Sequence, residues 1–165
     1  MLSFVVATDK NGVMGSSNGG LPWGKSQKAD LKRYRGLTEH HTIIMGRTTF
    51  DELPEPLPNR HHTVVTHEPK SSSDEHVEFM TFEQTLKKYK DFDEEYFVIG
   101  GSKIFDLFLP YTRTIYLTII DAEYDGDVYF SSFDKAVWKQ VSEKHFNSDE
   151  RNLHDYTFLE YSKTD

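Results

Sequence analysis

Residues 95–105, EYFVIGGSKIF, carry an apolar run of strand length directly into two glycines and a helical pattern. The run is aromatic and β-branched and too short for a helix, which predicts a strand buried on both faces of a sheet. Ile104, Phe105 and Phe108 then follow helical spacing and predict a helix over roughly 102–109. A buried strand that leads at once into a helix is the unit of a parallel α/β sheet.

The same unit recurs on the N-terminal side of this stretch. Further apolar runs lie at 2–7, 42–46 and 62–66, and further helical patterns lie at roughly 28–37, 47–53 and 81–90. The alternation predicts an α/β fold with a central, mostly parallel twisted sheet and helices on both faces.

The C-terminal part of the sequence changes character. Residues 113–130 and 155–163 alternate more between apolar and polar side chains and have no helical pattern between them. They predict antiparallel strands added at one side of the sheet. Asp125-Gly126 predicts a tight turn. The polar stretches 68–75 and 90–95 predict mobile surface loops.

Length and composition limit the function classes. A chain of 165 residues without a long linker predicts one domain over residues 1–165. The net charge of −8 repels nucleic acid and anionic membranes, so neither is an expected partner. The absence of cysteine excludes disulfides and thiol catalysis. No apolar run approaches the ~20 residues that span a bilayer, and Met1 leads straight into the first strand without a basic leader, so we expect a cytoplasmic protein.

Metal and hydrolase signals are weak in this sequence. His40-His41 and His61-His62 are adjacent pairs, and adjacent residues of a strand point to opposite faces. Acids alternate in DAEYDGD, residues 121–127, but the later glutamate of a calcium-binding loop is missing. There is no G-x-S-x-G motif for serine hydrolysis. We therefore expect no metal site.

Two strand ends carry residues that suit an anion. Gly46-Arg47-Thr48-Thr49 offers backbone N–H groups, a guanidinium and two hydroxyls at the start of a helix. Gly100-Gly101-Ser102-Lys103 repeats the arrangement, although it is not the G-x-G-x-x-G fingerprint. Each alone also fits an ordinary strand-to-helix turn. Together, at the carboxyl ends of strands in one sheet, they could hold a diphosphate.

A third strand end follows the run at 62–66. Thr66 and His67 would suit a further phosphate if they lay near Arg47, as on a 2′-phosphorylated ribose. The alternative is a solvated strand end, which the two residues alone favour.

Asp30 is the acid at the head of the 28–37 helix. It lies beside the apolar stripe of Leu31 and Tyr34. One interpretation is favourable interaction with the helix dipole, because acids are common in a first turn. The other is a polar group that anchors a ligand in an apolar pocket.

With these residues in place, the chain resembles the dihydrofolate reductase family over nearly its whole length. The matching motifs, in order, are Ala7, Val13-Met14-Gly15, Leu21-Pro22-Trp23, Asp30-Leu31, residues 44–49, residues 56–60, Val98-Ile99-Gly100-Gly101, Tyr116-Leu117-Thr118 and Gly126-Asp127. One motif could be chance, whereas nine in the right order are highly specific. The resemblance implies hydride transfer from NADPH to the pterin ring of dihydrofolate, giving tetrahydrofolate.

The resemblance also implies roles for individual residues. Asp30, Trp23 and Thr118 would form the catalytic group: Asp30 holds the pterin and supports its protonation through water, and Thr118 is its hydrogen-bonding partner. Residues that would line the substrate pocket are Val5, Ala7, Leu31, Tyr34, Leu53, Leu57 and Phe105, with Arg60 on the glutamate carboxylate of the substrate. Antifolate inhibitors would bind in the same place, and the protein would act as a monomer.

The implied cofactor site is larger. Its residues are Ala7, Met14, Gly15, Leu21, Gly46, Arg47, Thr48, Thr49, Thr66, His67, Ile99, Gly100, Gly101, Ser102, Lys103 and Ile104. Arg47, Thr66 and His67 match the family's site for the 2′-phosphate, which implies NADPH over NADH. The Gly100–Gly101 peptide is cis in the family. Residues 10–24 would form a lid, braced by Asp127.

One departure concerns that lid. The usual bacterial pattern has the acid five residues after the tryptophan, whereas Asp30 lies seven after Trp23, and the usual proline between them is missing. The sequence therefore does not determine the conformation of the closed lid. Two other readings remain: a pyrimidine reductase of riboflavin synthesis, which would lack the set of Trp23, Asp30 and Arg60, and an inactive nucleotide-binding homologue, which would bind NADPH without turnover.

Overall fold

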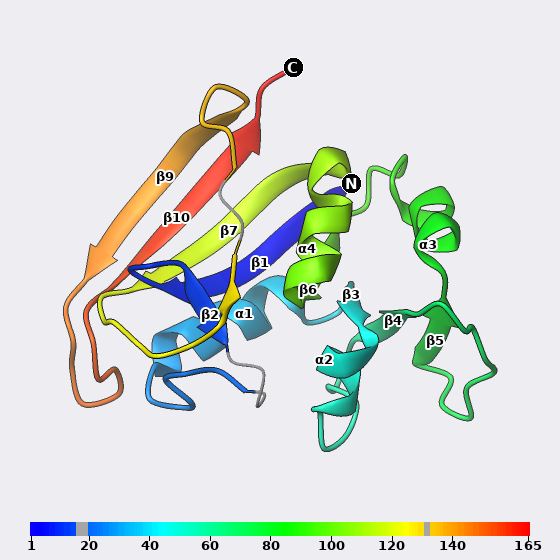
Figure 1. Ribbon diagram of the computed structural model, residues 1–165, viewed down its shortest axis with the longest axis horizontal. Coiled ribbons are helices and arrows are strands. Elements are labelled where there is room, and N and C mark those ends of the chain that lie inside the picture. Colours follow the sequence, from blue (N-terminus) through cyan, green and yellow to red (C-terminus); the bar gives the residue numbers. More distant parts are fainter. Residues whose placement is uncertain (16–19, 131–132) are drawn as a thin grey trace. The chain divides into compact units, whose positions relative to one another are not determined.

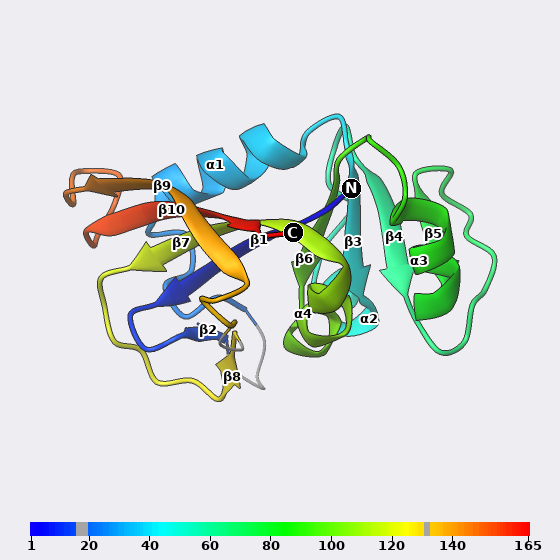
Figure 2. The same cartoon turned by 90° about the horizontal axis from the view of Figure 1, so that it is seen from above.

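The computed structural model describes residues 1–15, 20–130 and 133–165 (Figures 1 and 2). Within them, eight strands share one sheet in the order β5-β4-β3-β6-β1-β7-β10-β9. Their bounds are β1 Leu2–Asp9, β3 Thr42–Gly46, β4 His61–Val65, β5 Val77–Met80, β6 Tyr96–Gly100, β7 Thr112–Ile120, β9 Trp138–Phe146 and β10 Tyr156–Lys163. A separate pair consists of β2 Val13–Gly15 and β8 Val128–Tyr129. The helices are α1 Lys28–Thr38, α2 Arg47–Asp51, α3 Phe82–Tyr89 and α4 Ser102–Phe108, followed by the 3₁₀ turn Leu109–Tyr111.

The chain divides into two compact units. The first unit comprises residues 1–4 and 38–113, and the second comprises residues 5–37 and 114–165. Strands β1 and β7 contribute residues to both units. No helix in the described part of the chain is long and apolar enough to cross a membrane.

The first unit is a parallel sheet. β4 pairs with β3 and with β5, β6 pairs with β3, and the start of β1 pairs with β6, all in parallel. Ile43, Ile44 and Val98 are fully buried, which explains why these strands read as continuous apolar runs. α4 packs on β6 and β3, and α3 packs on β4. The predicted strands and helices of this part are confirmed.

The helix α3 has a complete N-terminal cap. The Thr81 hydroxyl accepts a hydrogen bond from the Gln84 backbone N–H at 3.2 Å, and the Gln84 side chain accepts one from the Thr81 N–H at 2.9 Å. This capping box satisfies two N–H groups that a helix start otherwise leaves without partners. The helix therefore begins after Thr81, one residue later than its pattern suggests.

The second unit carries the antiparallel addition. β10 pairs antiparallel with both β7 and β9, and β9 and β10 run side by side in Figure 1. This confirms the predicted mixed sheet. The prediction of a tight turn at Asp125-Gly126 is wrong, because these two residues form no turn. The Tyr124 N–H instead donates to the Asp9 carboxylate at 2.8 Å, so the segment is held by the end of β1.

Candidate active site

Asp30 lies in the first turn of α1, and its carboxylate is a hydrogen-bond partner of the Thr118 side chain on β7. Burial raises the pKa of Asp30 above its usual range, while the Thr118 hydrogen bond and the charge of Arg33 act in the opposite direction. A carboxyl whose pKa is raised in this way is suited to proton-linked chemistry.

Arg33 follows Asp30 by one helical turn and contacts the same strand. Its Nη1 donates to the Leu117 carbonyl at 3.0 Å and to the Thr118 hydroxyl at 3.3 Å, and its Nη2 donates to the Leu159 carbonyl at 3.0 Å. The sequence pattern did not single out Arg33. Its only local signal is the spacing of three residues from Asp30, which places both side chains on one face of α1.

Trp23 is buried in a small cluster of the second unit. It packs with Ile120 and Tyr156, and Ala7 and Ala29 are partly buried against this cluster. The ring of Tyr124 meets the Trp23 ring edge-on with centroids 6.0 Å apart. Two of the residues predicted for the site, Trp23 and Ala7, are therefore brought together by the fold.

The longer segment between Trp23 and Asp30 is ordered by hydrogen bonds. The Gly24 N–H donates to the Leu21 carbonyl at 3.0 Å, and the Ser26 N–H donates to the Trp23 carbonyl at 3.1 Å. Gly24 has a φ of +56°, a conformation that glycine adopts at little cost. These turns take up the extra residues before α1 begins.

The same segment is joined to the loop between β9 and β10. The Lys28 N–H donates to the Arg151 carbonyl at 3.1 Å, and the Leu153 N–H donates to the Ser26 carbonyl at 3.1 Å. The Asn152 side chain accepts from the Ala29 N–H at 2.9 Å. The start of α1, and with it Asp30, is positioned by residues more than a hundred positions later in the chain.

Residues 13–15 of the predicted lid form a strand that pairs with residues 128–129. β2 pairs antiparallel with β8, and the buried Asp9 carboxylate accepts from the N–H groups of Asn11 and Val13 as well as Tyr124. Asp9 was missed by the sequence pattern, because its partners are backbone groups. Bracing by Asp127 remains a prediction, and residues 16–19 of the lid lie outside the described residues.

In the first unit, the two glycine turns lie at the ends of neighbouring strands. β3 and β6 pair in parallel, and α2 and α4 begin directly after them. A Cβ added to Gly46 would lie 2.9 Å from Ile104 Cγ1, and one added to Gly101 would lie 3.6 Å from Thr49 Oγ1. The Gly100–Gly101 peptide is cis, as the resemblance implies. The structure thus brings the two predicted anion-binding turns together.

The helix starts at these turns lack side-chain caps. Gly46 and Gly101 are the N-cap residues of α2 and α4, and neither makes a side-chain cap hydrogen bond. The first N–H groups of a helix need acceptors from outside the helix. Diphosphate oxygens are acceptors of this kind, so the residues present fit a dinucleotide cofactor.

Arg47 and Thr66 follow neighbouring strands in the same register. Gly46 pairs with Val65 across β3 and β4, so the next residue of each strand lies at the same sheet edge. Arg47 Nε donates to both carboxylate oxygens of Asp51, at 3.0 and 3.1 Å. This contact fixes the guanidinium at the end of β3, while His67 is exposed.

Lys70 is a second cation at this edge that the sequence pattern did not predict. Its Nζ lies 5.0 Å from the centroid of the Phe79 ring, and the Arg47 guanidinium lies 5.3 Å from the same centroid. Both cations therefore lie against one aromatic ring, and Arg47 is also paired with Asp51.

Arg60 and Leu57 are held by their own neighbours. Arg60 is buried, and it donates through Nε to the Pro58 carbonyl at 3.0 Å and through Nη1 to the Thr38 hydroxyl at 3.2 Å. The His62 ring accepts from the Leu57 N–H at 2.9 Å. The loop that carries both predicted substrate contacts is therefore well defined.

Comparison with known proteins decides the family. A family model described as dihydrofolate reductase matches residues 1–163 of the chain. The chain belongs to the dihydrofolate reductase family. The dihydrofolate reductase of Bacillus subtilis (strain 168) is 40% identical over 166 residues, covering 99% of this chain and 95% of that protein. That of Staphylococcus haemolyticus is 33% identical over 162 residues, covering 98% and 95%.

A solved structure gives the same result. Dihydrofolate reductase from Enterococcus faecalis, complexed with NADP(H) and RAB-propyl, is similar with a TM-score of 0.90 and 32% identity, covering 100% of this chain and 97% of that chain. The resemblance to the dihydrofolate reductase family and its fold are thereby confirmed. A pyrimidine reductase of riboflavin synthesis and an inactive nucleotide-binding homologue are not favoured.

The predicted site residues of this dihydrofolate reductase family member divide between the two units. The second unit holds Val5, Ala7, Met14, Gly15, Leu21, Trp23, Asp30, Leu31, Tyr34 and Thr118. The first unit holds Gly46, Arg47, Thr48, Thr49, Leu53, Leu57, Arg60, Thr66, His67, Ile99, Gly100, Gly101, Ser102, Lys103, Ile104 and Phe105. Phe105 packs on Phe4 with ring centroids 4.8 Å apart.

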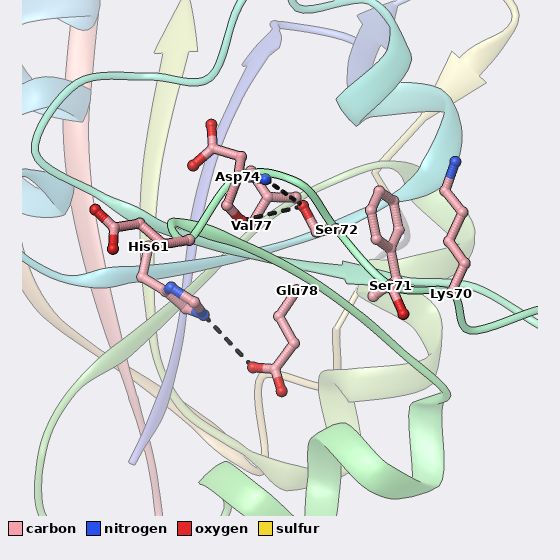
Figure 3. Close-up of a pocket in the computed structure, with 9 residues that line it drawn as sticks. His61, Lys70, Ser71, Ser72, Asp74, Val77 and Glu78 are labelled. Atoms are coloured by element: carbon pink, nitrogen blue, oxygen red, sulfur yellow. Dashed lines mark hydrogen bonds and ion pairs between the residues drawn. The ribbon is translucent and has the colours of Figure 1, made fainter.

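The first unit also has a polar pocket. It is lined by His61, Lys70, Ser71, Ser72, Asp74, Glu75, Val77, Glu78 and Phe79. In Figure 3 the side chains of His61 and Glu78 point toward one another, with 3.5 Å between Nε2 and Oε2. None of the predicted site residues of the dihydrofolate reductase family lines it.

Proposed function

We propose that this chain catalyses the NADPH-dependent reduction of 7,8-dihydrofolate to 5,6,7,8-tetrahydrofolate. The observation that carries the proposal is the desolvated carboxylate of Asp30, held by Thr118 at the start of α1, in a chain that matches the family over residues 1–163. The chain is then an oxidoreductase of one-carbon metabolism.

Asp30 binds and orients the pterin. Its two oxygens accept hydrogen bonds from the amino group and the adjacent ring nitrogen, a paired and charge-assisted contact. Its pKa is raised by burial above the usual aspartate range, which favours proton exchange by this carboxyl. A water molecule carries the proton to the ring nitrogen that needs it. Trp23, Leu31 and Tyr34 exclude other water from this part of the site.

The glycine turns bind the cofactor. NADPH supplies the hydride when it is bound. Gly46, Thr48, Thr49, Gly101, Ser102, Lys103 and Ile104 bind its diphosphate and the adjoining groups. Arg47, Thr66 and His67 bind the 2′-phosphate, which selects NADPH over NADH, because a guanidinium gives strong charge-assisted bonds to phosphate. Ala7, Met14, Gly15, Leu21, Ile99 and Gly100 complete the cofactor contacts.

The remaining predicted residues bind the rest of the substrate. Val5, Ala7, Leu53, Leu57 and Phe105 line the wall for the pterin and benzoyl groups. Arg60 binds the glutamate α-carboxylate, a task for a planar guanidinium with a fixed direction. Its bonds to Pro58 and Thr38 supply that direction before the substrate arrives.

Further properties belong to the same proposal. The chain acts as one domain and as a monomer. It binds antifolate inhibitors in place of the substrate and does not bind nucleic acid, because its net charge is −8. We place it in the cytoplasm.

The test is a turnover assay. The purified protein is mixed with NADPH and dihydrofolate, and loss of the reduced nicotinamide absorbance is followed. We expect turnover by the wild type and a fall in kcat of about a hundredfold or more for Asp30→Asn, since proton transfer by a positioned group contributes ~10²–10⁴-fold. Glu83→Gln on the exposed face of α3 is the matched control and keeps wild-type activity.

Two outcomes would contradict parts of the proposal. A wild type that binds NADPH but never oxidises it with dihydrofolate would overturn the function. An Asp30→Asn variant as active as the wild type would leave the function standing and remove Asp30 from its role.

A further inference from the structure

We infer that Arg33 is a positioning residue that aims the Thr118 hydroxyl proton at the Asp30 carboxylate. The role of Arg33 in the reaction rests on the proposed function. The contacts that carry it all lie within the second unit. They join α1 to β7 and β10, and in Figure 2 α1 lies along this part of the sheet.

The direction of the hydrogen bonds follows from chemistry. An arginine guanidinium only donates, whereas a hydroxyl has one proton and two acceptor sites. Arg33 Nη1 lies 3.3 Å from Thr118 Oγ1, so the hydroxyl oxygen accepts from Arg33. The single proton of that hydroxyl is then directed to the other partner of Thr118, which is the Asp30 carboxylate.

The guanidinium is itself held in place. Its other bonds, at 3.0 Å each, go to the backbone carbonyls of Leu117 on β7 and Leu159 on β10. Its carbon lies 4.6 Å from the centroid of the Phe158 ring and 5.9 Å from that of Tyr116. Backbone acceptors and ring faces do not rotate away, so Arg33 has a defined orientation toward Thr118.

The charged neighbours of this cluster come from three elements. Asp30 on α1, Tyr116 on β7 and Glu160 on β10 all face the guanidinium. The positive charge of Arg33 and the proton donated by Thr118 both favour the ionised carboxylate, whereas desolvation favours the neutral acid. Arg33 is therefore one of the two groups that favour the ionised form of Asp30.

The test titrates Asp30 directly. The Asp30 carboxyl carbon is followed by NMR against pH in the ligand-free protein, with Asp30→Asn used to assign the signal. In Arg33→Met we expect the midpoint to move up by about one pH unit, since a nearby opposite charge lowers a carboxyl pKa by roughly 1–3 units. Lys32→Met removes an exposed positive charge from the same helix and leaves the midpoint unchanged.

Two further variants separate positioning from charge and from a folding defect. Thr118→Val keeps Arg33 and its backbone bonds, and we expect an upward shift smaller than that of Arg33→Met. In the double variant the shifts are less than additive, because both changes remove the same Thr118 hydrogen bond. Arg33→Lys keeps the positive charge, so we expect an upward shift of the Asp30 midpoint that is smaller than in Arg33→Met. This variant serves as the test if Arg33→Met does not fold.

The outcomes are distinct. A midpoint in Arg33→Met equal to that of the wild type, or shifts that add fully in the double variant, would overturn the inference. The titration needs no turnover, so a failure of the proposed function in the NADPH assay would not affect it. In the active enzyme, the same variants shift the apparent pKa of the pH–rate profile in parallel.

Discussion

The side chain of Gln27 and the backbone of His154 are hydrogen-bonded in both directions. Gln27 Nε2 donates to the His154 carbonyl at 3.1 Å, and the His154 N–H donates to Gln27 Oε1 at 2.8 Å. Gln27 is only 1% exposed and stands directly before α1. The pairing explains how a segment longer than the family pattern still delivers Asp30 to Thr118.

Replacing Gln27 by alanine tests this role. The variant leaves the part-buried N–H and carbonyl of His154 without their side-chain partners, and a fully buried group in that situation costs about 1–3 kcal/mol. We expect the free energy of unfolding to fall by about 2–4 kcal/mol in urea titrations. Lys25→Ala, at an exposed position of the same segment, should stay within about 0.5 kcal/mol of the wild type. Equal stability of the two variants would show that the pairing is not needed.

The raised pKa of Asp30 predicts a dependence of stability on pH. The unfolded chain releases the Asp30 proton at lower pH than the folded protein does. The free energy of unfolding of the wild type therefore falls, relative to that of Asp30→Asn, as the pH rises. The fall begins at the ordinary aspartate pKa of about 3.9 and ends above the pKa of Asp30 in the folded protein. Above that value the difference is constant, and the Asn variant is the more stable protein at neutral pH.

Urea titrations of both proteins at several pH values measure this difference. The two free energies should converge in acid, where Asp30 is protonated in both states. A difference that does not change with pH, or a wild type that gains stability over the variant on going to neutral pH, would contradict the raised pKa.

The contact between Gly46 and Ile104 predicts a steric cost. An alanine at Gly46 puts its Cβ 2.9 Å from Ile104 Cγ1, so Ile104 must shift. We expect a loss of about 1–3 kcal/mol of stability, typical of overpacking, and weaker NADPH binding by fluorescence titration. Gly36→Ala on α1 meets no atom within 4 Å and should be neutral or stabilising. Adding Ile104→Ala should reduce the cost of Gly46→Ala, and an unchanged cost would place the strain elsewhere.

The position of Arg47 at the end of β3, where the neighbouring strand β4 also ends, predicts a change in cofactor preference. Arg47→Gln loses a charge-assisted bond to the 2′-phosphate, worth about 1.5–3 kcal/mol. The ratio of kcat/KM for NADPH to that for NADH should fall about tenfold to a hundredfold, at 1.4 kcal/mol per factor of ten. Lys87→Gln, exposed on α3, is the control for the loss of one charge. An unchanged ratio would remove Arg47 from the phosphate site.

Much of the fold could be predicted because its strands are buried on both faces. The runs that became β1, β3, β4 and β6 are apolar almost throughout, and β3 and β6 lead into the two glycine turns. β9 has no such signal, because it lies at the sheet edge and most of its side chains are exposed. Half-buried edge strands carry little hydrophobic pattern of their own.

The sequence by itself determined the buried strands β1, β3, β4 and β6, the four helices, the two glycine turns and the acid at the head of α1. These features depend on the spacing of neighbouring residues, which sets burial and backbone conformation locally. Only the tertiary structure decided that Arg33 reaches Thr118 and that Gln27 pairs with His154. Their partners lie 85 and 127 residues away along the chain, and a hydrogen bond over such a distance depends on how the strands are paired rather than on any local pattern.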